Sequence, residues 1–392
     1  MITRMILRGN FPTDKFERLE TPFYYYNLEL LRATLDTIHE AIRHNPEYCV
    51  HYAVKANANP EILRTIAHAG FGADCVSGGE ILAAVKAGFP SDKIVYAGVG
   101  KTDREINIGL DNDIFCFNVE SEPELEVINE LAAAKGKIAS VAIRVNPDVG
   151  AHTHANITTG LAENKFGIAL TDLDRVIDLA RSLNNIRFIG LHFHIGSQIL
   201  DMTDFTALCN RVNFLVERLE ARGLDIPNIN VGGGLGIDYK HPNHHDIPDF
   251  KGYFDTYRRH LKLRPGQSLH FELGRAVVGQ CGSLISRVVY VKEGTKKKFV
   301  ILDAGMTDLI RPALYQAYHR IENITSDSGI VERYDVVGPV CESSDVFGKE
   351  VDLPLTRRGD LIALRSTGAY GEIMASQYNC RELPRSYTSD NL

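Results

Sequence analysis

Lys55 directly follows a short apolar run, residues 49–54, which the sequence predicts to be a buried strand. Burying an ammonium group is costly unless a partner compensates the charge. A lysine at a strand end commonly extends past it and keeps its ammonium group in water. In a partly desolvated pocket, however, a lysine has a lowered pKa and can form a Schiff base with a carbonyl compound. At this point the sequence leaves both interpretations open.

Other polar residues also follow predicted strands, where barrel enzymes carry their active-site residues. They comprise acids, two histidines, two arginines, two serines and a run of glycines: Asp74, Ser77, Arg144, His192, His194, Ser197, the glycines 232–234, Glu272 and Arg275. Packing alone does not require such a set. We therefore expect these residues to converge on one site.

The glycine run, within NVGGGLG at residues 230–236, resembles a loop that binds phosphate. Consecutive glycines let backbone N–H groups approach an anion closely, and a nearby helix N-terminus adds its dipole. The run follows the seventh predicted strand, where barrel enzymes often bind phosphate. Because a glycine run can also be a simple flexible turn, this interpretation depends on its neighbours.

Together these residues match the parts that hold pyridoxal phosphate. Lys55 would bind the aldehyde and the glycines the phosphate, while Glu272 would bind the pyridine nitrogen and a histidine would stack on the ring. The residues therefore predict a phosphorylated aldehyde cofactor.

The histidines allow two other interpretations. His192 and His194 share one face of a predicted strand, so they could be a pair of core histidines. With the histidines of HPNHH, residues 241–245, they could in principle bind zinc. That segment is a polar loop and the spacing fixes no third ligand, so we expect no metal and assign ring stacking to one histidine.

The elements that must position these residues alternate between short apolar runs and segments of helical period. Strands are expected at residues 49–54, 72–76, 94–97, 114–119, 139–145, 187–193, 228–232 and 269–272. Helix signals include Pro60 with Gly70, a capping box of Ser121 and Glu124, and the segments 170–183 and 202–223. Eight strands that alternate with helices over roughly 240 residues predict a (β/α)8 barrel. A doubly wound sheet would also alternate, but polar residues at the strand ends favour the barrel.

After about residue 275 the pattern changes to strands joined by short turns, with the basic run at residues 292–298 expected as a hairpin turn. We expect a pyridoxal-phosphate-binding barrel over residues 26–266. A mostly β domain is expected from residues 267–392 and is predicted to take in residues 1–25.

Composition and charge exclude several classes of function. The net charge of -7 is spread along the chain and argues against a nucleic-acid partner. No apolar run is long enough for a signal peptide or a membrane span, so we expect a cytoplasmic protein with no membrane partner. The seven cysteines include no C-x-x-C pair and fit neither a disulfide framework nor a structural zinc site.

Six motifs, in order, resemble those of the fold-type III pyridoxal-phosphate-dependent decarboxylases. They are YAVKAN, HFHIGSQ, VGGGLG, ELGR, GPVCESSDVF and STGAYG, and the resemblance extends over residues 21–384. Within this family the motifs are most similar to those of enzymes that act on meso-2,6-diaminopimelate. The resemblance implies a lyase that uses pyridoxal 5'-phosphate to form L-lysine and carbon dioxide, the last step of lysine biosynthesis.

The resemblance also implies roles for single residues. Lys55 and Cys341 would be catalytic, the first by carrying the cofactor and the second by returning a proton after carbon dioxide leaves. Cofactor contacts would come from Lys55, Asp74, His194, Ser197, Gly233, Gly234, Glu272, Leu273, Gly274, Arg275 and Tyr370. Substrate contacts would come from Arg275, Arg311, Tyr315, Glu342 and Tyr370. Arg144 and His192 would support these groups.

Three further implications concern larger features. The resemblance implies an obligate homodimer in which the β-rich domain contributes substrate-binding and dimer-interface residues, and the neighbouring subunit supplies Cys341 and Glu342. Residues 152–167 resemble a mobile loop over the mouth of the barrel. Leu273 stands where the family usually has proline, but its neighbours in the ELGR motif are unchanged.

Three alternative functions are considered. Decarboxylases of ornithine, lysine or arginine act on substrates without a distal carboxylate, which would leave Arg311 without a partner; the ornithine enzymes usually carry aspartate at the position of Glu342. An alanine racemase pairs the pyridine nitrogen with an arginine. The presence of Glu272 at that position argues against a racemase. A non-catalytic regulatory relative tends to lose the Schiff-base lysine or the proton donor, and Lys55 and Cys341 are both present.

Overall fold

The computed structural model describes residues 9–147 and 165–392. The chain forms two compact units, which we treat separately. The barrel unit consists of Thr34–Gly236 and Asp249–Gly274, and the sheet unit consists of Ile237–Pro248, Arg275–Leu392 and the chain up to Ala33. The division into two domains at residue 266 remains a prediction.

Eight parallel strands close into a barrel in the described part of the chain, as the alternation predicted. They are β2 (Tyr48–Ala53), β3 (Gly72–Cys75), β4 (Ile94–Tyr96), β5 (Cys116–Val119), β6 (Ala139–Arg144), β7 (Ile186–His192), β8 (Asn228–Asn230) and β9 (Ser268–Leu273). Each strand pairs with the next in sequence, and β2 pairs with β9 to complete the ring. The register of that last pair places His51 opposite Glu272.

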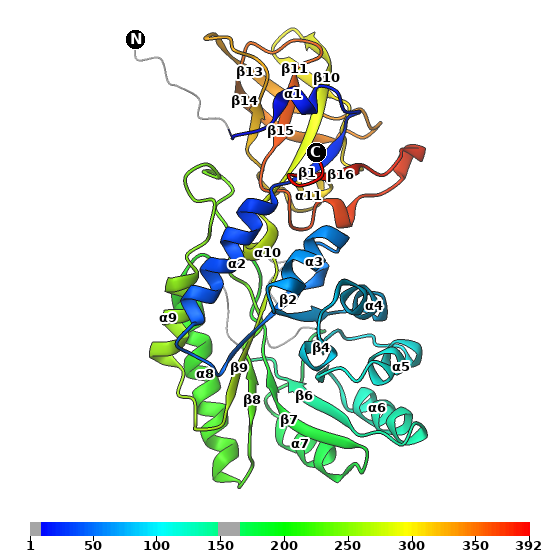
Figure 1. The fold of residues 1–392 in the computed structure, drawn as a ribbon, viewed down its shortest axis with the longest axis vertical. Helices are drawn as coiled ribbons and strands as arrows, with labels where there is room; N and C mark the ends of the chain where they lie inside the picture. The colour runs from blue at the N-terminus through cyan, green and yellow to red at the C-terminus, as the bar shows by residue number, and fades with distance from the viewer. Residues whose placement is uncertain (1–8, 148–164) are drawn as a thin grey trace. The chain divides into compact units, whose positions relative to one another are not determined.

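Helices follow the strands and surround them on the outside (Figure 1). They are α3 (Pro60–His68), α4 (Gly78–Ala87), α5 (Asp103–Asp111), α6 (Glu122–Ala134), α7 (Leu173–Ser182), α8 (Met202–Ala221) and α9 (Phe250–His260). Another helix, α2 (Leu28–Ile42), precedes β2. Positive-φ glycines follow several helix ends: for example, Gly70 comes two residues after α3, and Gly88 is the C-cap of α4.

The capping box expected at residue 121 forms only in part. Ser121 accepts a hydrogen bond from the backbone N–H of Glu124 at 3.3 Å, as predicted. The Glu124 carboxylate, however, accepts from the N–H of Glu120 at 2.7 Å. It turns away because it also pairs with the ammonium group of Lys101 at 2.6 Å. A complete capping box is found instead at α5, between Thr102 and Glu105.

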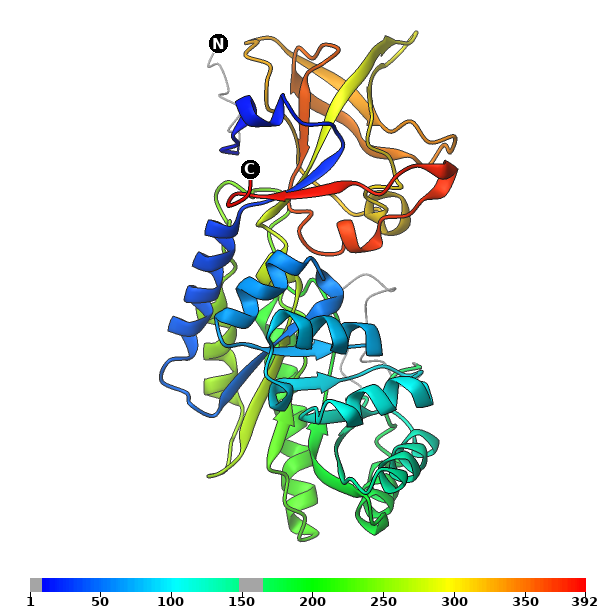
Figure 2. The ribbon, with the colours of Figure 1, turned by 45° about the vertical axis from the view of Figure 1, so that its right-hand side comes forward.

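The sheet unit is built on eight strands within the described residues. They are β1 (Phe23–Tyr26), β10 (Gly282–Glu293), β11 (Lys298–Leu302), β12 (Ile321–Asn323), β13 (Val331–Val337), β14 (Val346–Pro354), β15 (Leu361–Leu364) and β16 (Arg385–Thr388). Their order is β12-β15-β10-β11-β13-β14, and β1 pairs with both β10 and β16. Figure 2 shows β1 in blue and β16 in red side by side. The N-terminal segment therefore joins this sheet, as predicted.

Three short helices accompany the sheet: α1 (Thr13–Phe16), α10 (Arg275–Val278) and α11 (Arg311–Tyr315). One hydrophobic cluster joins aromatic side chains of the N-terminal segment to the sheet, namely Phe16, Phe23, Tyr25, Ile285, Ile324, Leu361 and Ala363. Because these side chains come from α1, β1, β10, β15 and the residue after β12, burying them fixes the N-terminal segment to the sheet. Basic residues 292–298 form the expected hairpin between β10 and β11.

The fold class is thus a (β/α)8 barrel followed by a mostly β region that includes the N-terminal strand. Among the described helices, none has both the length and the apolar character needed to cross a bilayer.

Candidate active site

Lys55 lies in a short turn, Val54–Ala56, directly after β2. Its side chain is 38% exposed and lines a cavity of about 470 Å³ at the carboxyl ends of the barrel strands. The same cavity is lined by Arg144, His192, His194 and Glu272. The structure therefore brings these sequence-predicted residues together at the barrel mouth, where barrel enzymes perform their chemistry.

Asp74 is the charged partner of Lys55. It lies on β3, beside β2, and its carboxylate oxygen Oδ2 is 3.2 Å from the Lys55 ammonium nitrogen. Burial and the nearby charge of Glu272 raise the pKa of Asp74 to about 7, although Lys55 opposes the rise. Its second oxygen, Oδ1, is buried with no hydrogen-bond partner among the described residues.

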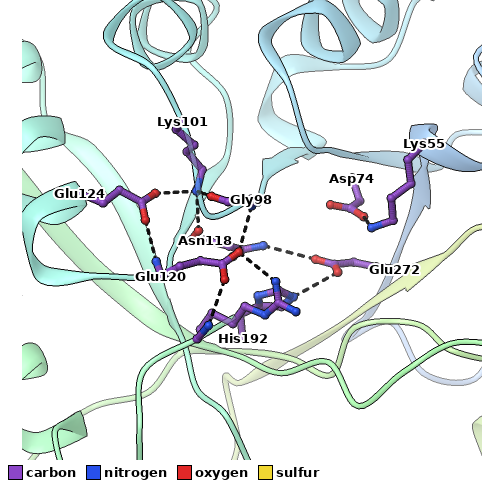
Figure 3. A network of polar contacts seen from close by, with 11 residues as sticks. Lys55, Asp74, Gly98, Lys101, Asn118, Glu120, Glu124, His192 and Glu272 are labelled. Carbon is purple, nitrogen blue, oxygen red and sulfur yellow. Dashed lines mark hydrogen bonds and ion pairs between the residues drawn. The ribbon is translucent and has the colours of Figure 1, made fainter. Parts of the chain in front are cut away.

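Glu272 is buried on β9, and three side chains donate hydrogen bonds to its carboxylate. His192 donates to Oε2 at 3.1 Å, while Asn118 and Asn230 donate to Oε1 at 3.3 and 2.8 Å. Burial alone would raise the pKa of Glu272, but the charge and hydrogen bond of His192, together with Lys55, lower it below its usual value. Figure 3 shows Asn118 and His192 directed at the Glu272 carboxylate. Because its pKa is lowered, this carboxylate is anionic at neutral pH.

His194, two residues after the end of β7, provides a neutral ring. Burial lowers its pKa well below the usual value, and the positive charges of Arg144 and Lys55 lower it further. Its Nδ1 atom accepts a hydrogen bond from the backbone N–H of Gly233 at 3.4 Å. A neutral imidazole beside the cavity has a flat face that can stack on an aromatic ring.

The glycines 232–234 lie where side chains cannot fit. A Cβ atom at Gly233 would be 1.9 Å from the carbonyl oxygen of Glu272, and one at Gly232 would be 2.4 Å from that of Phe193. Gly234 has a φ of +110°, which disfavours any residue with a side chain. The loop is thus pressed against the ends of its neighbouring strands, and only backbone atoms occupy its surface.

Ser197 lies on a segment that runs beside this glycine loop. Ile199 and Gly234 form a hydrogen bond between the two segments at 2.9 Å, and Gly236 donates back to Ile199 at 2.9 Å. Gly274, just after β9, would place a Cβ atom 3.1 Å from the methyl groups of Ala53 and Ala56. The end of β9 at Leu273 and Gly274 therefore packs closely against the turn that carries Lys55.

Lys101 lines the same cavity, but its ammonium group is bound by neighbouring protein groups. Its ammonium group donates to the carbonyl oxygens of Gly98 and Asn118 at 2.9 and 2.8 Å, and to Glu124 at 2.6 Å. All three of its protons are therefore used, and its side chain is only 1% exposed. Glu120, which lies beside Lys101 and Glu124 (Figure 3), pairs with Arg144 at 2.9 Å.

In the sheet unit, Arg275 and Arg311 are both buried, each with 6% of its surface exposed. One nitrogen of each guanidinium donates to the hydroxyl oxygen of Tyr239, at 2.6 Å from Arg275 and 2.8 Å from Arg311. Arg275 also stacks over the ring of Tyr370 at 4.9 Å. Tyr315 ends the short helix α11, which begins at Arg311. The structure thus gathers the predicted arginines and Tyr370 in one cluster.

Cys341 and Glu342 lie on the surface of the sheet unit as it is described here. Asp345 shapes the segment that presents them, because its carboxylate accepts hydrogen bonds from the N–H groups of Val340 and Met306 at 2.7 Å each. Glu342 accepts a hydrogen bond from the hydroxyl of Tyr378 at 2.7 Å. The two predicted residues are therefore held on a defined, exposed turn.

The histidines of the polar loop form a different group from the one considered in the sequence. Asp238, His241 and His245 are the described residues whose ligand atoms come close enough to hold a metal ion. Both histidine Nδ1 atoms lie within hydrogen-bond distance of one oxygen of Asp238, at 3.1 and 2.8 Å. His192 and His194 belong to no such group. Most of the predicted mobile loop, residues 152–164, lies outside the described residues.

Three contributors were missed from the sequence. Asn118 and Asn230 lie in buried strands, and a polar amide inside an apolar strand was the available signal. Tyr239 follows the glycine run by five residues, and no spacing rule indicates its contact with the arginines. These contacts depend on strand register and loop packing, which only the structure gives.

The barrel mouth has the groups that pyridoxal phosphate requires. Lys55 offers an amine at the cavity, Glu272 an anionic carboxylate, and His194 a neutral ring. The glycine loop offers backbone atoms where side chains would clash. Buried polar atoms without partners among the described residues, Asp74 Oδ1 and His192 Nδ1, also lie at this mouth. The residues present therefore fit the cofactor.

Comparisons with known proteins agree with this fit. A family model described as "Pyridoxal-dependent decarboxylase, pyridoxal binding domain" matches residues 29–279. The chain is 72% identical to a diaminopimelate decarboxylase of Bacteroides thetaiotaomicron, with 98% of this chain and 100% of the relative covered. It is 41% identical to one of Aquifex aeolicus, covering 92% of this chain and 84% of the relative. The crystal structure of diaminopimelate decarboxylase from Helicobacter pylori complexed with L-lysine is similar, with a TM-score of 0.90, 40% identity, and 96% and 93% of the two chains covered.

Proposed function

The chain belongs to the family of pyridoxal-dependent decarboxylases, and we propose that it converts meso-2,6-diaminopimelate to L-lysine and carbon dioxide. This is the last step of lysine biosynthesis. The observation that carries the chemistry is the buried, anionic Glu272, which lines the same cavity as Lys55. The choice of substrate is supported by relatives that are named diaminopimelate decarboxylase and match nearly the whole chain.

Pyridoxal phosphate, when bound, supplies an electron sink for the electron pair that remains when the substrate loses carbon dioxide. Lys55 binds the cofactor through its amine. Glu272 favours a proton on the pyridine nitrogen, because its negative charge stabilises the positive charge there. His194 stacks on the ring. His192, Asn118 and Asn230 fix the orientation of Glu272 through their hydrogen bonds.

The phosphate is bound, in this proposal, by Ser197 and by the backbone of Gly233 and Gly234. Leu273, Gly274 and the start of α10 at Arg275 complete the contacts, with the hydroxyl of Tyr370. Asp74 is fixed on β3 and holds the Lys55 side chain toward the cavity. These assignments are supported by the absence of room for side chains at the glycine loop.

For the substrate, Arg275 and Arg311 supply guanidinium groups that match a carboxylate, assisted by Tyr315 and Tyr370. Glu342 supplies a carboxylate for the ammonium group at the same end of the substrate. The Cys341 thiol donates a proton to the carbon that has lost carbon dioxide. A free, exposed thiol next to an acid supports this role.

We further propose a homodimer in which Cys341 and Glu342 serve the site of the neighbouring subunit. Their exposure on a turn held by Asp345 supports this arrangement. A cytoplasmic location follows from the proposed biosynthetic role.

Release of carbon dioxide tests the substrate directly. The purified protein with pyridoxal phosphate is assayed on meso-2,6-diaminopimelate, ornithine, lysine and arginine. We expect kcat/KM for diaminopimelate to exceed each other value by about 100-fold or more, since only this substrate satisfies both the arginines and Glu342. Faster release from ornithine, lysine or arginine would overturn the proposed substrate.

A further inference from the structure

Tyr239 joins the two arginines of the sheet unit. Its hydroxyl oxygen accepts a hydrogen bond from Arg275 at 2.6 Å and from Arg311 at 2.8 Å. The Arg311 guanidinium also lies over the Tyr239 ring, 5.3 Å from its centre, and that of Arg275 lies at 6.0 Å. One side chain therefore holds both cations through its oxygen and its ring.

Two buried guanidinium groups this close repel each other strongly, because little water screens them. Arg311 forms no ion pair with a carboxylate in the described part of the chain, and its buried Nε atom has no hydrogen-bond partner there. His319, whose ring packs edge-on against Tyr239 at 5.2 Å, adds no charge. Its pKa is lowered to about 3 by burial and by the two arginines. The cluster is thus rich in positive charge.

The Tyr239 hydroxyl is suited to this environment. Burial would raise the pKa of its phenol, but the charges of Arg275 and Arg311 and their hydrogen bonds lower it below the usual value. An oxygen with increased negative character between two guanidinium groups reduces their repulsion. It does so without supplying the bidentate carboxylate that guanidinium groups prefer.

The backbone on both sides of Tyr239 is fixed. The side-chain amide of Gln280 donates to the carbonyl oxygens of Asp238 and His245 at 2.9 and 3.0 Å. The Asp238 carboxylate accepts from the N–H groups of Lys240 and His241 at 2.8 and 3.0 Å. These contacts hold the loop on which Tyr239 stands, so the phenol oxygen has a defined position.

We propose that Tyr239 is a positioning residue that holds Arg275 and Arg311 as a preformed pair for the substrate carboxylate that is retained in L-lysine. This inference rests on the proposed function. Preformed donors lose less conformational entropy when the ligand binds, so the effect of Tyr239 falls on affinity for that carboxylate. Tyr239 acts through the arginines and needs no contact with the reacting carbon.

The test compares wild-type holoenzyme with Tyr239→Phe, which keeps the ring and removes only the hydroxyl. Tyr334→Phe is the matched control, because Tyr334 is a buried tyrosine whose hydroxyl bonds Glu332 at 2.8 Å and touches neither arginine. For each protein, kcat and KM are measured on meso-2,6-diaminopimelate. Binding of L-lysine and of cadaverine, a diamine without carboxylates, is measured by calorimetry.

Tyr239→Phe is expected to raise KM and the Kd for L-lysine by about 10-fold or more, with kcat within about 3-fold of wild type. The Kd for cadaverine is expected to stay within about 2-fold, since it presents no carboxylate to the arginines. Tyr334→Phe is expected to match wild type in all four quantities. The proposed role of Tyr239 would be overturned if Tyr239→Phe raised the Kd for both ligands equally. It would also be overturned if KM and the Kd for L-lysine were unchanged.

A double variant distinguishes a role in positioning the arginines from a nonspecific disturbance of the fold. In an Arg311→Gln background, adding Tyr239→Phe is expected to change the L-lysine Kd by less than about 2-fold, because one arginine of the pair is already gone. This background also carries one buried charge fewer, so the comparison holds even where Tyr239→Phe alone does not fold. A further large loss would contradict the inference. A wild-type enzyme that releases no carbon dioxide from diaminopimelate would instead overturn the proposed function, and the inference with it.

Discussion

Lys55 and Lys101 line the same cavity and differ in what surrounds their ammonium groups. Lys101 is almost fully buried, and its three protons are used by two carbonyl oxygens and Glu124. Lys55 keeps about a third of its side chain exposed toward the cavity and pairs with Asp74. A lysine whose protons all bind neighbouring protein groups, such as Lys101, stabilises the fold. Lys55 instead faces the cavity beside Asp74, an acid with a raised pKa, and can bind a ligand.

Glu272 gives a prediction at the residue scale. In Glu272→Gln the side chain cannot carry the negative charge that favours a proton on the cofactor's pyridine nitrogen. We expect kcat on meso-2,6-diaminopimelate to fall by about 100-fold or more, measured as carbon dioxide release. Glu124→Gln is the control, because Glu124 is a buried carboxylate whose contacts among the described residues are Lys101 and the backbone N–H of Glu120. This variant should lower thermal stability and leave kcat within a few-fold. Equal activity in Glu272→Gln and wild type would contradict the role of the carboxylate.

From the sequence, the charged residues that line the cavity were easier to single out than the neutral residues that contact them. Lys55 and Glu272 stand out because charge at the end of an apolar run is rare and costly. Asn118 and Asn230 are less conspicuous, although they donate two of the three hydrogen bonds to Glu272. Tyr239 could not be predicted, since its partners are 36 and 72 residues away and meet it only in the folded loop.

At the element scale, the closure of the barrel contains a pair of buried histidines. His51 on β2 and His270 on β9 approach at 2.9 Å between Nε2 and Nδ1. The other nitrogen of His51 contacts the carbonyl oxygen of Lys93 at 3.0 Å, so it must carry a proton. Nε2 of His51 is then the acceptor and His270 the donor. Both rings can therefore stay neutral and still make these two hydrogen bonds.

These histidines predict how stability depends on pH. Burial and the neighbouring His51 lower the pKa of His270 to about 3, while an unfolded histidine titrates near 6.5. Between these pH values the unfolded chain binds more protons than the folded one. The free energy of unfolding therefore falls as the pH falls below about 6.5, by at most about 1.4 kcal/mol per pH unit for this group.

Urea unfolding of wild type and His270→Gln at pH 7 and pH 5 measures this effect. The loss of stability between the two pH values is expected to be smaller in His270→Gln, since glutamine does not titrate. His68→Gln, at an exposed position on α3, serves as the control and should lose as much as wild type. An equal loss in all three proteins would show that the buried pair does not govern the acid sensitivity of the barrel.

Element boundaries followed from the sequence where local signals act alone. Pro60 opens α3 as expected, and the predicted strands agree with the observed ones to within about two residues at most ends. The capping box at Ser121 was predicted with two hydrogen bonds, but the one from the Ser121 N–H to the Glu124 carboxylate does not form. That carboxylate instead binds Lys101, which lies in a different βα loop, and the N–H of Glu120. A tertiary ion pair thus overrides a local hydrogen bond, which no local pattern reveals.

At the scale of the whole molecule, the alternation of strands and helices was enough to predict a barrel, because each strand pairs with its sequence neighbour. The sheet unit was predicted only as mostly β. Its order is β12-β15-β10-β11-β13-β14, in which β15 pairs with β10 and β12, strands distant in sequence. Such pairing is decided by packing rather than by local pattern. The N-terminal strand was expected in this sheet, but not its parallel pairing with β16.

The proposed shared site predicts complementation between two inactive variants. Lys55→Ala and Cys341→Ala are each expected to lose nearly all activity as homodimers. After the two are mixed and their subunits exchanged, about half of the dimers are mixed, and each mixed dimer has one intact site. Carbon dioxide release should then recover to about a quarter of the wild-type value. No recovery, with exchange verified by mass spectrometry, would contradict a site shared between subunits.

The central claim is that the barrel mouth at Lys55 is where the cofactor binds and the reaction takes place. Borohydride reduction fixes a carbonyl cofactor to the amine that holds it, and peptide mass spectrometry then identifies that amine. We expect the pyridoxyl group on the peptide that contains Lys55, with none on the peptide that contains Lys101 and none on Lys55→Ala. A modification on Lys101 or another lysine, with Lys55 unmodified, would contradict the account.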